Sequence, residues 1–376
     1  MNTQLSYWEI KSWLSAIDFC IIGSGIVGLN CAIQLKKLYP RAKVLVLERG
    51  VLPQGASTKN AGFACFGSVS ELVTDLKSHS EEEVLDLVKF RLEGLKFMRA
   101  LLGDSSIGYQ QKAGYEVFQT NEDFNNQHFE AIPYLNNLLK SLFSNPVFKL
   151  ENERFGFKGF HKKVIKNTYE GQLDTGKMMF ALLQLARSKG IQVLNGVEVK
   201  KLSSNLNGVH IYSTEFDFKA KKVFIANNAF AKSLIDLPVK AVRNQVLVTE
   251  KIPNLKWNTC FHLEEGYYYF RAIDGRILIG GGRHLDPLTE TTSAFGTTQL
   301  VESKLIQLLN TNILPGQHPK IDYRWSGILG IGEKKAPLVK QLDNHLYCGV
   351  RMGGMGVAIG SAVGLQLANL INQPLG

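Results

Sequence analysis

The feature that most constrains the fold is a glycine-rich turn near the start of the chain, within IDFCIIGSGIVGLNCAIQL at residues 17–35. A short, mostly apolar run at 17–22 precedes the turn, and a helical pattern at 26–38 follows it and ends before Pro40. A second apolar run at 43–48 comes next. This order predicts a β-α-β unit with the glycines at its first turn.

The three glycines of the turn have the spacing of a dinucleotide-binding fingerprint. Gly23 permits a tight turn, Gly25 lets backbone amides approach a pyrophosphate, and Gly28 lets the helix pack close to the sheet. The helix N-terminus then offers free N–H groups to the phosphates. Glu48 ends the second apolar run about 20 residues later, where an acid binds the ribose. The motif predicts a dinucleotide site and leaves NAD and FAD both open.

The segment after Glu48 separates the two cofactors. A plain NAD dehydrogenase would have a second β-α-β repeat there, whereas this chain has the small-residue run GASTKNAG at 55–62. With its S-x-x-N-A-G pattern, the chain resembles the D-amino-acid oxidase family, which includes glycine oxidase and monomeric sarcosine oxidase. Further similar segments are EGQLD at 170–174, ANNAF at 226–230, WSG at 325–327 and GGMGV at 353–357.

The resemblance implies an α/β fold in which an FAD-binding, Rossmann-like domain of the glutathione reductase type is interleaved with a mixed β-sheet substrate domain. We expect the FAD-binding domain to comprise residues 15–80, 165–240 and 325–376. The substrate domain would comprise residues 81–164 and 241–324. Local patterns predict helices at about 81–103, where Ser80 begins a capping box, at 132–143 and at 175–188. They predict strands at 115–120 and 197–202.

The same resemblance implies which residues hold FAD. The expected cofactor residues are Gly23, Gly25, Ile26, Val27, Gly28, Glu48, Arg49, Ser57, Asn60, Ala61, Gly62, Val199, Asn227, Gly353, Gly354, Met355, Gly356 and Val357. Some relatives attach the flavin covalently through a histidine at the position of Asn60, and others through a C-terminal cysteine. Asn60 cannot form that bond, and residues 325–337 contain no cysteine. We therefore expect non-covalent FAD.

Substrate recognition in such a family often uses arginine and tyrosine, because a planar guanidinium matches a carboxylate in bidentate fashion. The candidates for catalytic or substrate contacts are Tyr267, Tyr269, Arg271, Arg283 and Arg351. Tyr267, Tyr269 and Arg271 alternate along one run and are expected on one strand face. His262 and His284 are candidate bases, although oxidation of a neutral amine needs no strong base.

The resemblance implies an FAD-dependent oxidoreductase that oxidises a C–N bond of an amino acid or secondary amine. Three alternatives stay open: a 2-hydroxy-acid dehydrogenase, a flavin-carrying subunit active only with a partner, and an NAD dehydrogenase. Leu278 lies near the position of the oxygen-activating lysine of sarcosine oxidase, and Leu329 and Gly354 lie near arginine positions of glycine oxidase. The substrate and the electron acceptor, oxygen or another carrier, therefore stay open.

The composition of the chain indicates which kinds of binding partner and which cellular compartment to expect. The 376 residues carry a net charge of +10, but the lysine pairs are scattered without interleaved aromatics, so we expect no nucleic-acid partner. Five cysteines without CxxC spacing favour reduced thiols and a cytoplasmic protein. No HExxH motif or Cys/His cluster occurs in the sequence, so we expect no metal site. Residues 352–376 are uncharged, yet their glycines and amides favour a buried helix over a membrane span.

Overall fold

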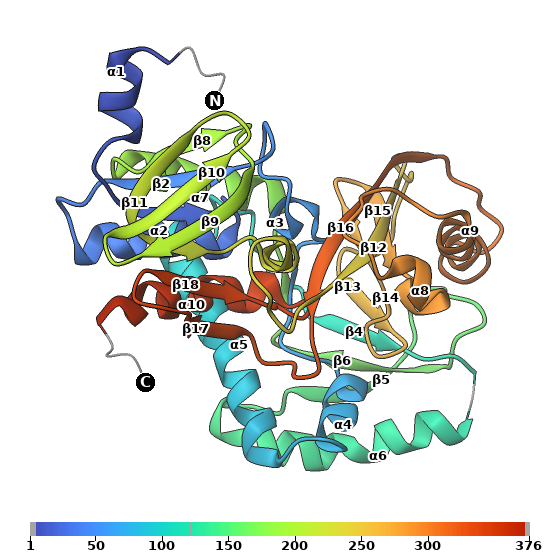
Figure 1. Cartoon of the computed structure of the whole chain (residues 1–376). Coiled ribbons are helices and arrows are strands. Elements are labelled where there is room, and N and C mark those ends of the chain that lie inside the picture. The colour runs from blue at the N-terminus through green and yellow to red at the C-terminus, as the bar shows by residue number, and fades with distance from the viewer. Residues whose placement is uncertain (1–4, 121, 373–376) are drawn as a thin grey trace.

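The computed structural model describes residues 5–120 and 122–372 and contains two large sheets (Figure 1). In the first sheet the strand order is β17-β18-β11-β1-β2-β8, and the β9–β10 hairpin adds to one end of β11. β18, β11, β1, β2 and β8 run parallel to one another, whereas β17 and β10 pair antiparallel with β18 and β11. The strands are β1 (Ile17–Ile22), β2 (Val44–Glu48), β8 (Gln192–Asn195), β9 (Val199–Asn205), β10 (Gly208–Ser213), β11 (Asp217–Ile225), β17 (Leu338–Gln341) and β18 (Leu346–Val350).

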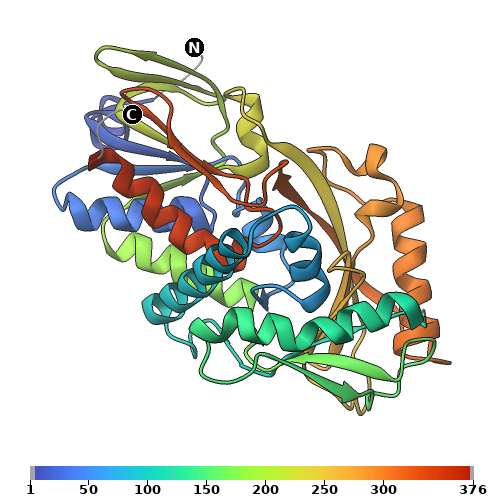
Figure 2. The same cartoon turned by 90° about the horizontal axis from the view of Figure 1, so that it is seen from below.

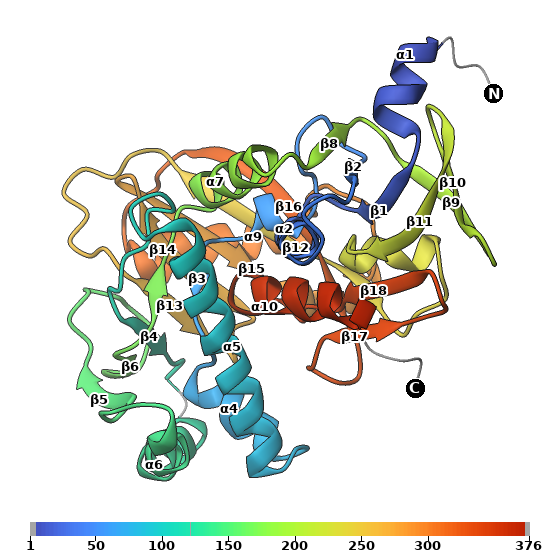
Figure 3. The same ribbon diagram turned by 90° about the vertical axis from the view of Figure 1, so that its left-hand side faces the viewer.

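Three helices pack against one face of this sheet: α2 (Ile26–Leu38), α7 (Thr175–Ser188) and α10 (Gly356–Asn369). The long helix α5 (Glu81–Leu102) crosses α10, as Figure 2 shows for the teal and red helices. Ser80 caps α5 through the predicted capping box, with Glu83 bonding back to the Ser80 amide. α1 (Tyr7–Glu9) and the following turn η1 (Ile10–Leu14) lie at the outer end of the sheet (Figure 3).

The second sheet has the order β16-β12-β15-β14-β13-β4-β6-β5. It is mixed, because β13 and β4 pair in parallel whereas the other neighbours are antiparallel. Its strands are β4 (Gly114–Val117), β5 (Phe148–Asn152), β6 (Lys163–Asn167), β12 (Lys240–Thr249), β13 (Cys260–Leu263), β14 (Tyr268–Ile273), β15 (Arg276–Gly281) and β16 (Ile321–Ile331).

Short elements fill the space around and between the sheets. α9 (Gln299–Gln307) and η5 (Leu308–Ile313) cover one face of the second sheet, while α4 (Val69–Leu76), α6 (Glu122–Leu138) and η2 (Leu139–Ser141) share a core with α5. The two-residue strands β3 (Phe63–Ala64) and β7 (Gly171–Gln172) pair with each other. The remaining elements are α3 (Ala56–Lys59), η3 (Asn228–Ser233), η4 (Arg283–Leu285), α8 (Pro287–Glu290) and η6 (Leu370–Asn372).

The predicted β-α-β unit is confirmed, with β1 at 17–22 and α2 at 26–38. Three predicted bounds were wrong. The strand expected at 115–120 ends at Val117, and the strand expected at 197–202 lies at 199–205. The helix expected from residue 132 begins at Glu122, because packing of residues such as Phe129 against Phe118 sustains helix through weak helix formers.

The expected division into two interleaved domains stays a prediction. α5 contributes Val84 and Val88 to the core it shares with α4 and α6, and Leu95 and Met98 to the core beneath the first sheet. The helix therefore belongs to both cores and marks no clear boundary at residue 81. Across the described ranges, 5–120 and 122–372, no helix has both the length and the apolar character that a bilayer crossing requires.

Candidate active site

A cavity of about 950 Å³ lies between the two sheets. One end is lined by the glycine turn after β1 and by the end of β2, and the other end by His262, Tyr269 and Arg283. Segments from distant parts of the sequence form its walls: 22–27, 47–49, 55–63, 226–230, 327–329 and 352–358. The volume is at the upper end of the range for small-molecule sites, roughly 300–1,000 Å³.

The glycine turn brings the N-terminus of α2 to the cavity. Gly23 has φ +104°, and a Cβ there would lie 3.0 Å from the carbonyl oxygen of Ala226. A Cβ on Gly28 would lie 2.0 Å from the carbonyl oxygen of Gly23, so this glycine is needed for close packing of α2. Of the expected cofactor residues, only Gly28 does not itself line the cavity. The Ser57 hydroxyl accepts a hydrogen bond from the Ile26 amide at 2.9 Å.

Glu48 is buried at the end of β2, beside this turn. Its carboxylate accepts hydrogen bonds from the amide and hydroxyl of Ser24, at 3.2 and 2.9 Å, and from the amides of Gly50 and Gln54. The next side chain, Arg49, stacks its guanidinium 3.8 Å from the ring centroid of Phe230. The acid expected to bind ribose is therefore fixed in place at the cavity wall.

Two further loops line the cavity. Asn60 holds the first loop: its Oδ1 accepts hydrogen bonds from the Gly62 amide and the Thr175 hydroxyl, while its Nδ2 donates to the carbonyls of Ala56 and Ser57. The second loop, 353–355, leads into α10, whose N-terminal residues Gly356 and Val357 also line the cavity. Two helix N-termini thus open onto one cavity.

These residues fit FAD. The N-terminus of α2 would hold the diphosphate, and the N-terminus of α10 would face the flavin edge where negative charge grows. Asn227 lines the cavity, and its buried Oδ1 has no hydrogen-bond partner among the described residues. A hydroxyl of the cofactor would supply that missing donor.

Two of the five predicted substrate residues line the cavity: Tyr269 and Arg283. The Tyr269 hydroxyl accepts a hydrogen bond from Nδ2 of Asn244 at 3.0 Å, and burial raises the pKa of this tyrosine to about 12. The Arg283 guanidinium stacks 4.7 Å from the ring centroid of Tyr267. It makes no ion pair with any carboxylate in the described part of the chain.

The other three predicted substrate residues do not line the cavity. Nη1 of Arg271 donates to the carbonyls of Gly62 and Leu173, at 2.9 Å each, and burial lowers the pKa of this arginine. Arg351 has φ +68°, and its Nε donates to the Ala336 carbonyl. Tyr267 precedes β14 and packs on Arg283 and His284, so it does not continue the strand face of Tyr269.

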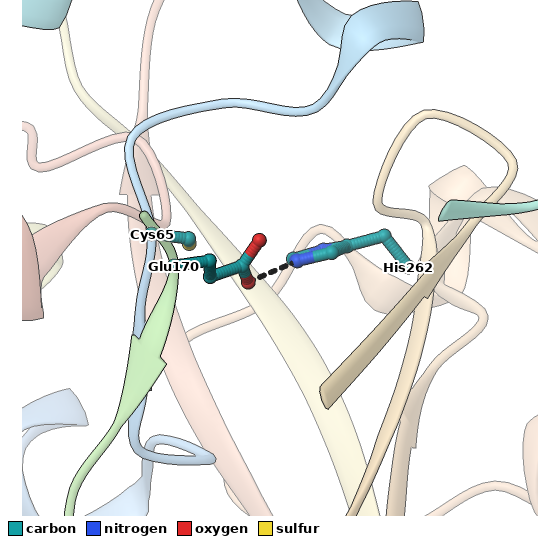
Figure 4. A group of neighbouring side chains, drawn as sticks. All are labelled: Cys65, Glu170 and His262. Atoms are coloured by element: carbon teal, nitrogen blue, oxygen red, sulfur yellow. Dashed lines mark hydrogen bonds and ion pairs between the residues drawn. The ribbon is translucent and has the colours of Figure 1, made fainter. Parts of the chain in front are cut away.

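The structure also assembles a cluster of polar side chains that sequence reasoning did not group together. Figure 4 shows Cys65, Glu170 and His262. One sulfur, carboxylate oxygen or ring nitrogen atom of each lies within 4.8 Å of those of the other two. Nε2 of His262 lies 2.5 Å from Oε1 of Glu170, and both Cys65 and His262 line the cavity. The residues come from three distant segments, so no local motif indicated their contact. The expectation of no metal site stays a prediction.

A second buried acid lies next to this cluster. Glu116 on β4 is the register partner of His262 on β13. Its carboxylate accepts hydrogen bonds from the hydroxyls of Ser68 and Ser70 and from the Ser70 amide. Burial raises the pKa of Glu116 to about 7, although the bonds from Ser70 oppose the shift.

Comparisons with known proteins agree with this architecture. The solved glycine oxidase from Geobacillus kaustophilus is 20% identical, with a TM-score of 0.75 and coverage of 94% of each chain. L-proline dehydrogenase from P. horikoshii is 18% identical, with a TM-score of 0.74, covering 94% of this chain and 93% of that one. At these identities the likeness shows the shared fold: an FAD-binding domain of the glutathione reductase type with a mixed-sheet substrate domain.

Curated relatives match in sequence as well. The bifunctional protein ThiO/ThiG of Synechocystis is 29% identical over 238 residues, which are 61% of this chain and 32% of the relative, so the chain spans about a third of that protein's length. Gamma-glutamylputrescine oxidoreductase of Escherichia coli is 24% identical over 94% of this chain and 83% of its own length. The model of the DAO family, described as FAD dependent oxidoreductase, matches residues 18–370. The chain therefore belongs to the DAO family of FAD-dependent oxidoreductases.

Proposed function

We propose that this chain oxidises a C–N bond of an amino acid or secondary amine whose carboxylate is held by Arg283. The observation that carries the proposal is the Arg283 guanidinium, which borders the cavity without a carboxylate partner among the described residues. Its charge also acts on the buried Tyr269 hydroxyl, so the two groups lie at the same end of the cavity. The names of gamma-glutamylputrescine oxidoreductase and glycine oxidase support an amino compound as substrate.

FAD, when bound, supplies the two-electron oxidation by accepting a hydride equivalent from the substrate carbon. The chain's own residues would position the substrate for that step. Arg283 would fix a carboxylate through paired N–H groups, and the Tyr269 hydroxyl, held by Asn244, would donate to the same group. Apolar side chains such as Phe63 and Val246 line the cavity nearby and limit the access of water.

The test is a panel of compounds added anaerobically to the purified, FAD-loaded protein. The panel contains amino acids, N-methyl amines and 2-hydroxy acids, and loss of the flavin absorption bands is the readout. We expect bleaching by at least one amine-bearing carboxylate. Bleaching by hydroxy acids alone would replace the proposal with a 2-hydroxy-acid dehydrogenase. Bleaching by no compound would favour a flavin-carrying subunit that needs a partner.

We further propose that FAD is bound without a covalent bond. The side chain of Asn60, at the position of the flavin-linking histidine in some relatives, is fully used in holding its own loop. A cytoplasmic location and the absence of a nucleic-acid partner stay predictions from composition. The electron acceptor stays open between oxygen and another carrier.

A further inference from the structure

The two ring nitrogens of His262 have different surroundings. Nε2 contacts the Glu170 carboxylate at 2.5 Å, whereas Nδ1 makes no hydrogen bond to any described residue. The residue is only 6% exposed, yet it borders the cavity, and the Phe63 ring packs against the imidazole edge to face at 5.2 Å. Nδ1 is therefore the ring nitrogen left without a hydrogen-bond partner among the described residues, on a side chain that borders the cavity.

The contact with Glu170 sets the tautomer of the neutral ring. A carboxylate accepts hydrogen bonds, so the proton of neutral His262 lies on Nε2, between the two side chains. This arrangement leaves a lone pair on Nδ1. A carboxylate-oriented imidazole with its other nitrogen free is the arrangement of a general base.

We propose that His262, oriented by Glu170, takes the proton that a substrate ammonium group releases before the C–H bond is oxidised. This inference rests on the proposed amine-oxidising function. In the step, an N–H bond of the ammonium breaks and its electron pair stays on the substrate nitrogen. An N–H bond forms at Nδ1 of His262, and no electrons are exchanged. The nitrogen lone pair so freed can form the C=N bond when the carbon is oxidised.

The charges around His262 suit this transfer. Glu170 contacts the ring directly, Glu116 extends from the neighbouring strand, Glu71 lies on α4 at the cavity wall, and Cys65 lies beside Glu170. Burial pulls the pKa of His262 down, but Glu170, with Glu71 and Glu116, outweighs burial and raises the pKa to about 9. Amino groups have ordinary pKa values of about 8 to 10, so the proton transfer is close to balanced.

His284, the other candidate base, lacks this geometry. It does not line the cavity, its Nε2 lies 3.5 Å from the Glu264 carboxylate, and burial lowers its pKa. The direct contact between Glu170 and His262 also leaves no room for an ion between these two atoms. A proton therefore explains the pair better than a metal does.

The experiment compares FAD-loaded wild type, His262→Gln and Glu170→Gln, with the exposed His318→Gln as control. Anaerobic stopped-flow measures the rate of flavin reduction against pH, with the best amine substrate of the panel. The wild-type rate should rise to a plateau with an apparent pKa near 9. His262→Gln should reduce flavin about 10²–10⁴-fold more slowly at the plateau and lose that ionisation. Glu170→Gln should move the apparent pKa of the rate profile to lower pH, because the ring loses its neighbouring negative charge.

A second readout does not depend on turnover. In FAD-loaded protein with ¹⁵N-labelled histidine, NMR should show one ring that titrates near pH 9 in wild type and is missing in His262→Gln. An unchanged pH profile in His262→Gln, with amines still reducing the flavin, would overturn this inference alone. A rate that EDTA abolishes and Zn²⁺ restores would overturn it in favour of a metal. If no amine reduced the flavin, the proposed function itself would fail.

Discussion

At the residue scale, Arg283 borders the cavity without a carboxylate partner among the described residues, whereas Arg271 is buried and bonded to two backbone carbonyls. We therefore expect substitution of Arg283 to change substrate binding and substitution of Arg271 to change stability. In Arg283→Lys, a single ammonium replaces the planar fork that would grip a carboxylate. Loss of one charged hydrogen bond, about 1.5–3 kcal/mol, should weaken binding of carboxylate substrates about 10- to 100-fold. The apparent Kd from anaerobic flavin bleaching measures this change. Arg324→Lys, which alters an ion pair with Glu302, is the control. Equal affinities in all three proteins would reject Arg283 as the carboxylate residue.

Arg271 should act on stability instead. Its guanidinium joins the Gly62 carbonyl in the flavin-facing loop to the Leu173 carbonyl before α7. Arg271→Leu leaves both carbonyls without this donor, so we expect the free energy of unfolding to fall by about 2–4 kcal/mol and FAD to dissociate more readily. Urea unfolding and flavin fluorescence give the two values. The order of substrates in the bleaching panel should stay the same. A changed order with unchanged stability would return Arg271 to the substrate site.

Asn60 leads to a prediction about the flavin linkage. An amide cannot form the bond that a histidine forms at this position in some relatives, so acid precipitation should release all the yellow colour into the supernatant. Ultrafiltration of the denatured protein measures the same partition. Absorbance at flavin wavelengths that stays with the polypeptide would contradict non-covalent binding, and Cys65, which also lines the cavity, would be the first residue to substitute.

At the element scale, the features that could be predicted are those with local causes. The glycine spacing predicts the turn into α2, and Ser80 with Glu83 predicts the start of α5, because each involves residues a few positions apart. The parallel pairing of β13 with β4 and the contact of His262 with Glu170 join segments far apart in sequence. No local pattern encodes such contacts. The substrate end of the cavity was therefore harder to predict than the dinucleotide end.

The crossing of α5 and α10 predicts the effect of a single methyl group. A Cβ on Gly94 would lie 2.1 Å from the Ala358 carbonyl oxygen, so Gly94→Ala must force the two helices apart. Overpacking of this kind costs about 1–3 kcal/mol, although alanine favours helix. We expect a lower Tm by differential scanning fluorimetry. Lys96→Ala, at an exposed position of the same helix, should not lower it. A Tm equal to wild type in Gly94→Ala would show that the helices separate at no cost.

At the scale of the whole molecule, two buried groups on neighbouring strands of the second sheet predict how stability depends on pH. The pKa of Glu116 is raised from 4.5 to about 7, and that of His262 from 6.5 to about 9. A group whose pKa is raised by folding binds its proton more tightly in the folded state. Its contribution to stability is complete at pH values below its pKa in the unfolded chain. That contribution is lost as pH rises to its pKa in the folded protein. Ionisation of Glu116 should therefore lower the free energy of unfolding as pH rises from about 4.5 to 7. Deprotonation of His262 should lower it further as pH rises from about 6.5 to 9.

Both effects have the same sign, so the free energy of unfolding should decline from mildly acidic to alkaline pH. Glu116→Gln keeps the hydrogen-bonding shape but cannot ionise, and should flatten the decline between pH 5 and 7 only. His262→Gln should flatten it between pH 7 and 9 only. Urea unfolding of the FAD-loaded proteins at pH 5, 7 and 9 measures the change in the free energy of unfolding over each pH interval. Glu82→Gln, at an exposed position, is the control. A decline between pH 5 and 7 as steep in Glu116→Gln as in wild type would show that Glu116 is ionised throughout. Glu116 would then place a negative charge beside the general base at pH 5 as well as at pH 9, and the His262 ring would hold its proton next to an anion over that whole range.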